Sequence, residues 1–340
     1  MIRSKRRRRR SRRRRKSPET LFWVLLLSVL ALGAAGFVAH NILFATEQAA
    51  EAEWDQVLTD AVGADDIEAP GWEPREPADH TNILLLGLDN QGMSDLIMIL
   101  SYHMKTYDST LISLKRDIFV SGQDWASKDS GQDHLAWAHN RGMGPEKDYH
   151  AGARLTAQTV EDLLGIDLHA YATISFDGFT QLVDLIGGVE IEVAPEFALR
   201  EGGALPTGLQ RLEGSQALVY ARHRQNPRIP EEGSTSQAGD RVLRNQRLLK
   251  AILEQCKTLG TDELLFIVGQ LDDKVCTTME DWDILDMANV LYNRDPGEIE
   301  TVILPGEGER VYQERIDSEM YYYFLNFEET DIILRELELK

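Results

Sequence analysis

Residues 81–117 read TNILLLGLDNQGMSDLIMILSYHMKTYDSTLISLKRD, and this stretch contains three apolar runs separated by short polar turns. The runs cover residues 81–87, 96–102 and 110–115. Continuous apolar runs of this length are typical of strands that are buried on both faces of a sheet. Because such a sheet needs a helical layer on each face, the rest of the chain should supply helices.

Helical and strand patterns alternate in the rest of the chain. Further strands are predicted at 171–175, 189–193 and 301–305, and helices at 153–165, 176–188, 213–224, 240–256, 262–271, 281–293 and 326–339. The stretch 118–152 contains five glycines and is predicted to be mostly loop. Strands that alternate with helices predict an α/β fold of three layers, α-β-α, in which a mixed central sheet is flanked by helices.

The N-terminal segment predicts a single transmembrane helix at 17–40. Leu21–Ala39 are nineteen uncharged residues, and about 28 Å of helix is enough to cross a hydrocarbon core. Twelve basic residues lie within 1–16, and Lys and Arg stay on the cytoplasmic side, so the N-terminus is predicted inside and the remainder outside the cell. Residues 3–39 should also contact anionic membrane lipid. A cleaved signal peptide is the alternative, because small residues end the apolar segment.

Beyond the anchor, residues 41–80 are polar and then rich in proline, which predicts a juxtamembrane stalk and linker before one extracellular domain at 81–340. The formal charge of −20 conceals an asymmetry, because the chain after position 16 carries 24 basic and 56 acidic residues, a charge of −32. A domain with this net negative charge repels the nucleic-acid backbone, so its overall charge argues against nucleic-acid binding. The two cysteines, Cys256 and Cys276, could form one disulfide or be two buried thiols.

Two carboxylates flank the turn between the first two predicted strands. Asp89 follows the first strand and Asp95 precedes the second. Mg²⁺ (or Mn²⁺) binds through one or two carboxylates and completes its shell with water and phosphate oxygens, so the pair is a candidate metal site. The alternative is that both residues form the turn or cap a neighbouring element.

Arginines gather at two further places, and they stand out against the acidic background. Arg116 ends the third strand, between Lys115 and Asp117. The segments YARHR (220–224) and GDRVLRNQR (239–247) contain the other candidates, which are Arg222, Arg224, Arg241 and Arg244. Arginine makes bidentate, charge-assisted hydrogen bonds to phosphate oxygens, and helix N-termini also favour anions. Solvated helix arginines paired to nearby acids are the alternative.

The span from about residue 81 to 257 resembles the LytR–CpsA–Psr family of bacterial cell-envelope proteins. The resemblance is carried by NILLLGLD (82–89), SD (94–95), SLKRDIFV (113–120), RLTAQTVEDLLGIDLHAYATISFDGFTQLVDLIGGVEIEV (154–193), LEGSQALVYARHR (212–224) and GDRVLRNQR (239–247). It implies a phosphotransferase that moves a glycopolymer, such as teichoic acid or capsule, from a polyprenyl-pyrophosphate carrier to peptidoglycan outside the membrane. It also implies an apolar groove for the lipid tail.

The resemblance assigns roles to individual residues. Its acids map onto Asp89 and Asp95, which would bind the metal and orient arginines. Its arginines map onto Arg116, Arg222, Arg224, Arg241 and Arg244, and its polar helix positions onto Asp240 and Gln246 or Asn245. Lys115 would add charge to the pyrophosphate site. The general base stays open between Asp89 and Asp117.

The chain departs from the family pattern in its first turn. The family has arginines around the turn between the two acids, whereas this turn reads NQGM and contains none. Two alternatives therefore stay open: a non-catalytic protein that binds polyprenyl phosphates or the envelope, and a lipid pyrophosphatase. A regulatory role ranks behind both, because a cytoplasmic tail of this length cannot read DNA in an ordered way. The eight histidines show no ligand spacing and are predicted to be ordinary core or surface residues.

Overall fold

The computed structural model describes residues 72–73, 79–106, 108–121, 126, 133–193, 205–222, 237–271, 274–279, 299–313 and 317–340, with side chains omitted for 237–240 and for parts of 261–268. The predicted anchor at 17–40, most of the predicted linker and the predicted helix at 281–293 lie outside these residues. Among the helices that are described, none combines the length and the apolar character needed to cross a bilayer.

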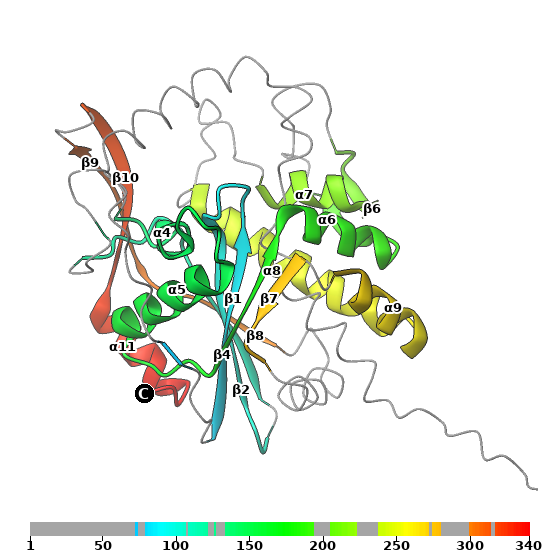
Figure 1. Cartoon of the computed structure of the whole chain (residues 1–340), viewed down its shortest axis with the longest axis horizontal. Helices are drawn as coiled ribbons and strands as arrows, with labels where there is room; N and C mark the ends of the chain where they lie inside the picture. Colours follow the sequence, from blue (N-terminus) through cyan, green and yellow to red (C-terminus); the bar gives the residue numbers. More distant parts are fainter. Residues whose placement is uncertain are drawn as a thin grey trace, which may run out of the picture.

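A mixed sheet of six strands forms the centre of the molecule, in the order β7-β4-β1-β2-β3-β8 (Figure 1). The strands are β1 (His80–Leu88), β2 (Ser94–His103), β3 (Ser109–Leu114), β4 (Ala170–Ser175), β7 (Val275–Thr277) and β8 (Glu300–Ile303). β1 pairs antiparallel with β2 and parallel with β4, while β3 pairs antiparallel with β2 and parallel with β8. The predicted mixed sheet is therefore confirmed.

Helices cover both faces of this sheet and create two hydrophobic cores. One face packs against α6 (Phe176–Leu185), α7 (Gly214–Arg222), α8 (Gln237–Lys257) and α9 (Thr261–Leu271). The other packs against α4 (Trp137–Met143), α5 (Tyr149–Leu164) and α11 (Phe327–Glu336). Alternate residues of β1 serve the two cores, since Leu85 lies in the first and Leu84 in the second. This arrangement explains why the strand sequence is continuously apolar.

Two hairpins stand beside the central sheet. β5 (Val189–Val193) pairs with β6 (Gly208–Leu212), and β9 (Gly306–Gln313) pairs with β10 (Ser318–Leu325). β5 alternates buried and exposed residues, as its sequence predicts. The sequence did not indicate β6, β7 or the β9–β10 hairpin, which extends away from the sheet (Figure 1).

The prediction of a mostly loop-like stretch at 118–152 is wrong in its second half. α4 occupies Trp137–Met143, and α5 begins at Tyr149 rather than at residue 153. Two of the glycines that suggested loop lie where the helices touch. A Cβ on Gly142 would stand 2.7 Å from the Ala151 carbonyl oxygen, and one on Gly152 would stand 2.6 Å from the His139 carbonyl oxygen. These glycines allow close helix packing rather than a flexible loop.

The two cysteines are free thiols on opposite sides of the sheet. Cys256, near the end of α8, is buried in the core on the α8 side, whereas Cys276 packs against the core on the α5 side. Of the two alternatives that the sequence left open, separate thiols are therefore the observed one.

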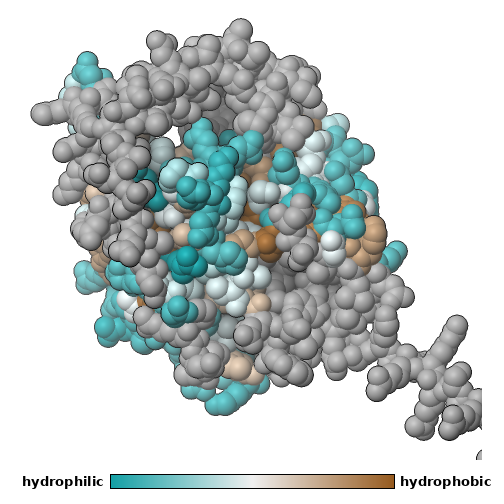
Figure 2. All heavy atoms as spheres, viewed as in Figure 1, coloured by the Kyte–Doolittle hydropathy of each residue, from teal (hydrophilic) through white to brown (hydrophobic). Residues whose placement is uncertain are grey.

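The described surface is largely hydrophilic on the face drawn in Figure 2. Among the described residues, seven large apolar side chains are exposed: Tyr149, Leu209, Leu243, Phe266, Tyr312, Phe327 and Ile332. Exposed apolar side chains are common on globular domains.

Candidate functional site

A carboxylate that contacts two arginines forms the centre of the candidate site. β2 and β3 are antiparallel with Ile97 opposite Leu114, and the same register two residues further on places Asp95 opposite Arg116. Asp95 Oδ1 accepts a hydrogen bond from Arg116 Nη1, and Asp95 Oδ2 lies 3.4 Å from Arg222 Nε. The side chains of Asp95 and Arg116 are 8% and 15% exposed, so solvent screens this pair little, whereas the Arg222 side chain is 38% exposed and its charge is partly screened.

Arg222 reaches this cluster from a third element, as the last residue of α7. Its guanidinium carbon lies 4.9 Å from the centre of the Phe176 ring, at the start of α6, in a cation–π contact. The Asp95 contact and the ring fix the direction of the guanidinium group. Arg224 lies outside the described residues.

Asp89 lies at the end of β1, where its turn holds it tightly. Its Oδ1 accepts hydrogen bonds from the backbone N–H groups of Gln91 (3.0 Å) and Met93 (2.8 Å). Burial raises the pKa of Asp89 above its usual value, while the charges of Arg116 and Arg222 act in the opposite direction. Asp89 therefore lies within electrostatic reach of the two arginines that contact Asp95.

The residues on either side of Arg116 have separate environments. Asp117 Oδ1 lies 3.6 Å from Arg116 Nε. Lys115 Nζ lies 3.6 Å from the centre of the Tyr323 ring, and burial lowers the pKa of this lysine. Its ammonium group thus rests on an aromatic ring of β10 instead of joining the carboxylate cluster.

The start of α8 contributes Arg241, while two other residues of α8 that the sequence nominates are engaged in packing. Arg244 is buried and its Nε donates to the Tyr220 carbonyl oxygen at 3.2 Å. Gln246 is also buried, and its Nε2 donates to Ser113 Oγ at 3.0 Å. These bonds tie α8 to α7 and to β3. Asp240 lies on α8, but its side chain lies outside the described part of the structure.

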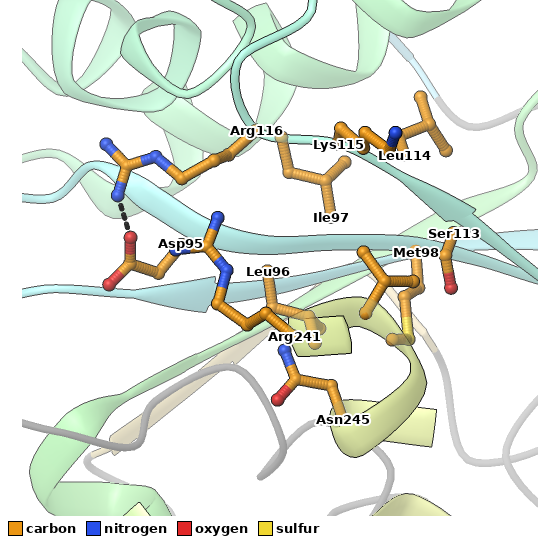
Figure 3. A pocket seen from close by; sticks show the side chains of 11 residues that line it. Asp95, Leu96, Ile97, Met98, Ser113, Leu114, Lys115, Arg116, Arg241 and Asn245 are labelled. Atoms are coloured by element: carbon orange, nitrogen blue, oxygen red, sulfur yellow. Dashed lines mark hydrogen bonds and ion pairs between the residues drawn. The ribbon is translucent and has the colours of Figure 1, made fainter. Parts of the chain in front are cut away.

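A hollow of about 310 Å³, which includes space open to solvent, lies between the β2–β3 strands and the start of α8 (Figure 3). Figure 3 shows Arg241 extending from α8 toward Asp95 and Arg116. The lining is charged near Asp95 and Arg116 and apolar along β2 and β3. The lining residues are Asp95, Leu96, Ile97, Met98, Ser113, Leu114, Lys115, Arg116, Arg241, Val242 and Asn245. The lining therefore combines charged groups, which would attract an anionic group, with an apolar surface.

The structure thus brings Asp89, Asp95, Arg116, Arg222 and Arg241 to one end of the sheet. Sequence reasoning did not find the residues that hold the turn between the two acids. His139 Nδ1 bonds to the Gly92 carbonyl oxygen at 2.9 Å, and Asn140 Nδ2 donates to the Gln91 carbonyl oxygen at 2.6 Å. Both bonds reach backbone atoms from a helix some fifty residues away, and residue spacing carries no signal for such a contact.

Solved structures share this fold. The crystal structure of Bacillus subtilis TagV superposes with a TM-score of 0.60 at 22% identity, covering 78% of this chain and all of that one. The structure of TagT bound to LIIa-WTA gives a TM-score of 0.59 at 22% identity, covering 82% of this chain and 98% of TagT.

Curated relatives extend the likeness to sequence. The polyisoprenyl-teichoic acid–peptidoglycan teichoic acid transferase TagU of Oceanobacillus iheyensis is 27% identical over 267 residues, which are 76% of this chain and 75% of TagU. The cell wall biosynthesis protein LcpA of Corynebacterium glutamicum is 28% identical over 273 residues, which are 72% of this chain and 50% of LcpA. The model of the LytR_cpsA_psr family matches residues 43–338. Since that match spans most of the chain, this protein belongs to the LytR_cpsA_psr family.

Proposed function

We propose that the protein transfers a phosphate-linked glycopolymer from a polyprenyl-pyrophosphate carrier to peptidoglycan, outside the membrane. The observation that carries the proposal is the single buried carboxylate, Asp95, that orients Arg116 and Arg222 from two different elements beside a partly apolar hollow. The relative named as a teichoic acid–peptidoglycan transferase supports the same reaction.

The pyrophosphate of the donor would bind to the arginines at the charged end of the hollow. Arg116 follows β3, whereas Arg222 and Arg241 come from α7 and α8. Their guanidinium groups offer planar donors that match phosphate oxygens. A domain that otherwise carries a large negative charge would repel such an anion, so the local arginines must supply the attraction. The apolar residues along β2 and β3 would contact the first units of the lipid.

The chemistry is displacement at phosphorus. A hydroxyl of the peptidoglycan sugar attacks the phosphorus that carries the polymer, the bond to the bridging oxygen breaks, and polyprenyl phosphate leaves. The arginines stabilise negative charge on the phosphate oxygens, so positioning and electrostatics carry most of the catalysis. The hydroxyl proton passes to a base, for which Asp89 and Asp117 are the candidates.

A divalent cation fits the donor set at this end of the sheet, and we propose Asp89 and Asp95 as its carboxylates. Both hydrogen bonds of Asp89 go to Oδ1, which leaves Oδ2 for a ligand. Asp95 already faces two guanidinium groups, so its larger share in the site is to orient them. Mg²⁺ (or Mn²⁺) bound there would neutralise charge on the diphosphate oxygens.

The same proposal includes the topology. The basic tail at 1–16 would lie in the cytoplasm, the helix at 17–40 would cross the membrane, and the catalytic domain would lie outside, near a carrier that is itself embedded in the bilayer.

A transfer assay with the full-length protein in lipid nanodiscs tests the function. The donor is a polyprenyl-pyrophosphate-linked oligosaccharide, the acceptor is peptidoglycan, and the products are separated into wall-linked and free polymer. We expect wall-linked product, a loss of roughly 10²–10³-fold for Arg116→Ala because a preorganised charge donor is removed, and no loss for Arg335→Ala, an exposed arginine paired with Asp331 on α11.

Three outcomes would contradict the proposal. Free polymer without wall-linked product would indicate a pyrophosphatase. Donor binding without turnover would indicate a non-catalytic envelope protein. Full activity of Arg116→Ala would remove the arginine cluster from the site.

A further inference from the structure

The turn between β1 and β2 is held by hydrogen bonds from α4. His139 Nδ1 contacts the Gly92 carbonyl oxygen at 2.9 Å, and Asn140 Nδ2 donates to the Gln91 carbonyl oxygen at 2.6 Å. The N–H of Ser94, the first residue of β2, donates to the carbonyl oxygen of Ala136, the N-cap of α4, at 3.0 Å. Three hydrogen bonds therefore join residues 91–94 to residues 136–140. This turn is the one that lacks the family's arginines.

One peptide unit connects His139 to Asp89. The carbonyl oxygen of Gly92 faces His139, and the N–H of the same peptide unit, which belongs to Met93, donates to Asp89 Oδ1 at 2.8 Å. A hydrogen bond to the carbonyl polarises the peptide and strengthens the bond that its N–H makes. The His139 imidazole therefore influences the Asp89 carboxylate through the one peptide group that joins Gly92 to Met93.

The position of the His139 ring is fixed by packing. The residue is fully buried. A Cβ on Gly152 would stand 2.8 Å from its Nδ1, and one on Gly92 would stand 2.7 Å from the methyl carbon of Met143. Because a carbonyl oxygen can only accept, Nδ1 must carry the proton. Nδ1 thus donates to the Gly92 carbonyl oxygen, while the Tyr149 ring lies 6.0 Å from the imidazole, centre to centre.

We propose that His139 and Asn140 are positioning residues that hold the turn so that the Asp89 carboxylate keeps Oδ1 on the backbone and presents Oδ2 to the divalent cation. This inference rests on the proposed function, whose metal site it deepens. The same contacts explain how a short turn without the family's arginines is held: side chains of α4 bond to its backbone.

The test compares variants that remove or keep the donor. His139→Leu and Asn140→Ala each remove one hydrogen bond, whereas His139→Asn keeps an N–H donor near the position of Nδ1. Mn²⁺ is the probe, and its binding to the full chain in nanodiscs is measured by the electron paramagnetic resonance signal of free Mn²⁺. We expect His139→Leu and Asn140→Ala to weaken Mn²⁺ binding by roughly 3- to 10-fold, the equivalent of one lost hydrogen bond.

The kinetic readout separates positioning from general damage. The kcat for transfer should fall by a similar factor while KM for the lipid donor stays within about two-fold, because the arginines are untouched, and His139→Asn should recover most of the loss. His134→Leu is the matched control, since His134 is buried and its ring contacts the Tyr321 carbonyl oxygen at 2.8 Å, on β10, instead of the Gly92 carbonyl oxygen. It should lower stability and leave Mn²⁺ affinity unchanged.

The inference is overturned if folded Asn140→Ala and His139→Leu keep the Mn²⁺ affinity and kcat of the wild type. Should His139→Leu fail to fold, the half-exposed Asn140→Ala decides alone. A wild-type chain that transfers polymer but binds no Mn²⁺ also overturns the inference while the transfer function stands. A chain that binds Mn²⁺ but releases only free polymer refutes the transfer function, and the Mn²⁺ measurement on the variants still decides the positioning role.

Discussion

Asp89 and Asp95 are two partly buried carboxylates a few residues apart, and their surroundings differ. Asp95 contacts two guanidinium groups directly. Asp89 accepts two backbone hydrogen bonds, and the arginines act on it only from a distance, so burial dominates and raises its pKa. A buried anion that lacks a direct countercharge is costly for the apo protein and attractive to a cation.

The first prediction follows from the sign of that shift. A carboxyl group whose pKa is raised on folding binds protons more strongly in the native state, so ionising it at neutral pH lowers stability. Asp89→Asn keeps the Oδ1 acceptor for Gln91 and Met93 and removes the charge. We expect this variant to be more stable than the wild type by about 0.5–2 kcal/mol at pH 7.5 without metal, and to lose transfer activity.

The pH dependence of unfolding is the internal control for this prediction. The stability gain should be full above the raised native pKa and should vanish as the pH falls toward the ordinary aspartate value of 3.8, where both states are protonated. Denaturant unfolding at pH 7.5, 5.5 and 4 measures it. A variant less stable than the wild type at pH 7.5 would show that the buried charge is already neutralised in the apo protein.

At the scale of elements, the crossing of α4 and α5 depends on glycine for a steric reason. A Cβ at Gly152 would meet the carbonyl oxygen of His139 at 2.6 Å and its ring at 2.8 Å, and backbone cannot move aside cheaply. Gly269, in contrast, lies in α9 with nothing within 4 Å of the added atom. Substitutions at these two helical glycines can therefore distinguish the effect of packing from the effect of helix propensity.

We predict opposite effects for alanine at these two positions. Gly152→Ala should destabilise the protein by about 1–3 kcal/mol through overpacking, whereas Gly269→Ala should be neutral or stabilise it by up to about 1 kcal/mol, because alanine favours the helix. Thermal and urea unfolding of both variants measure the difference. Equal effects would mean that the α4–α5 contact relaxes without cost, and would weaken the argument that packing fixes His139.

The elements that the sequence predicts correctly are those whose pattern is set by burial on one or both sides. β1, β2 and β3 are continuously apolar because two helical layers cover them, and α5, α6 and α8 each have one apolar face. α4 and the first residues of α5 were missed because Gly142 and Gly152, which allow the helices to touch, look the same in sequence as glycines that serve loops. The β9–β10 hairpin was missed because most of β9 faces solvent and carries no apolar alternation.

The candidate site divides in the same way. Charged residues at strand ends could be nominated from the sequence, because strands of one sheet bring their ends together, and the Asp95–Arg116 contact is of this kind. Their contacts could not be assigned individually. Lys115 packs on Tyr323, and Arg244 bonds to the Tyr220 carbonyl oxygen, both through tertiary packing of distant segments. His139 reaches only backbone atoms, which every residue offers, so the sequence does not specify its partner.

At the scale of the whole molecule, the core on the α5 side includes a residue from the segment that the sequence predicts as linker. Trp72 is only 4% exposed, and its ring centre lies 5.7 Å from that of Tyr171. Its Nε1 donates to Glu161 Oε2 at 3.0 Å, and Glu161 Oε1 accepts from the Leu168 N–H at 2.8 Å. A buried glutamate thus joins α5, the following loop and a residue that precedes β1.

The last prediction is that this contact contributes to the stability of the folded domain. Trp72→Phe keeps an aromatic ring but removes the hydrogen bond that the indole N–H donates to the Glu161 carboxylate, which should cost about 1–3 kcal/mol. Trp72→Ala also removes the ring and should cost about 3–5 kcal/mol. Phe327→Ala is the control, because Phe327 is 60% exposed and should change stability by less than about 0.5 kcal/mol.

Urea unfolding of the full chain in nanodiscs, followed by tyrosine and tryptophan fluorescence, measures all three variants. If Trp72→Ala unfolds as readily as Phe327→Ala, the contact of Trp72 with α5 is dispensable, and the folded unit begins at β1. If the predicted order holds, the folded unit begins before β1 and includes Trp72, which the sequence assigned to the linker.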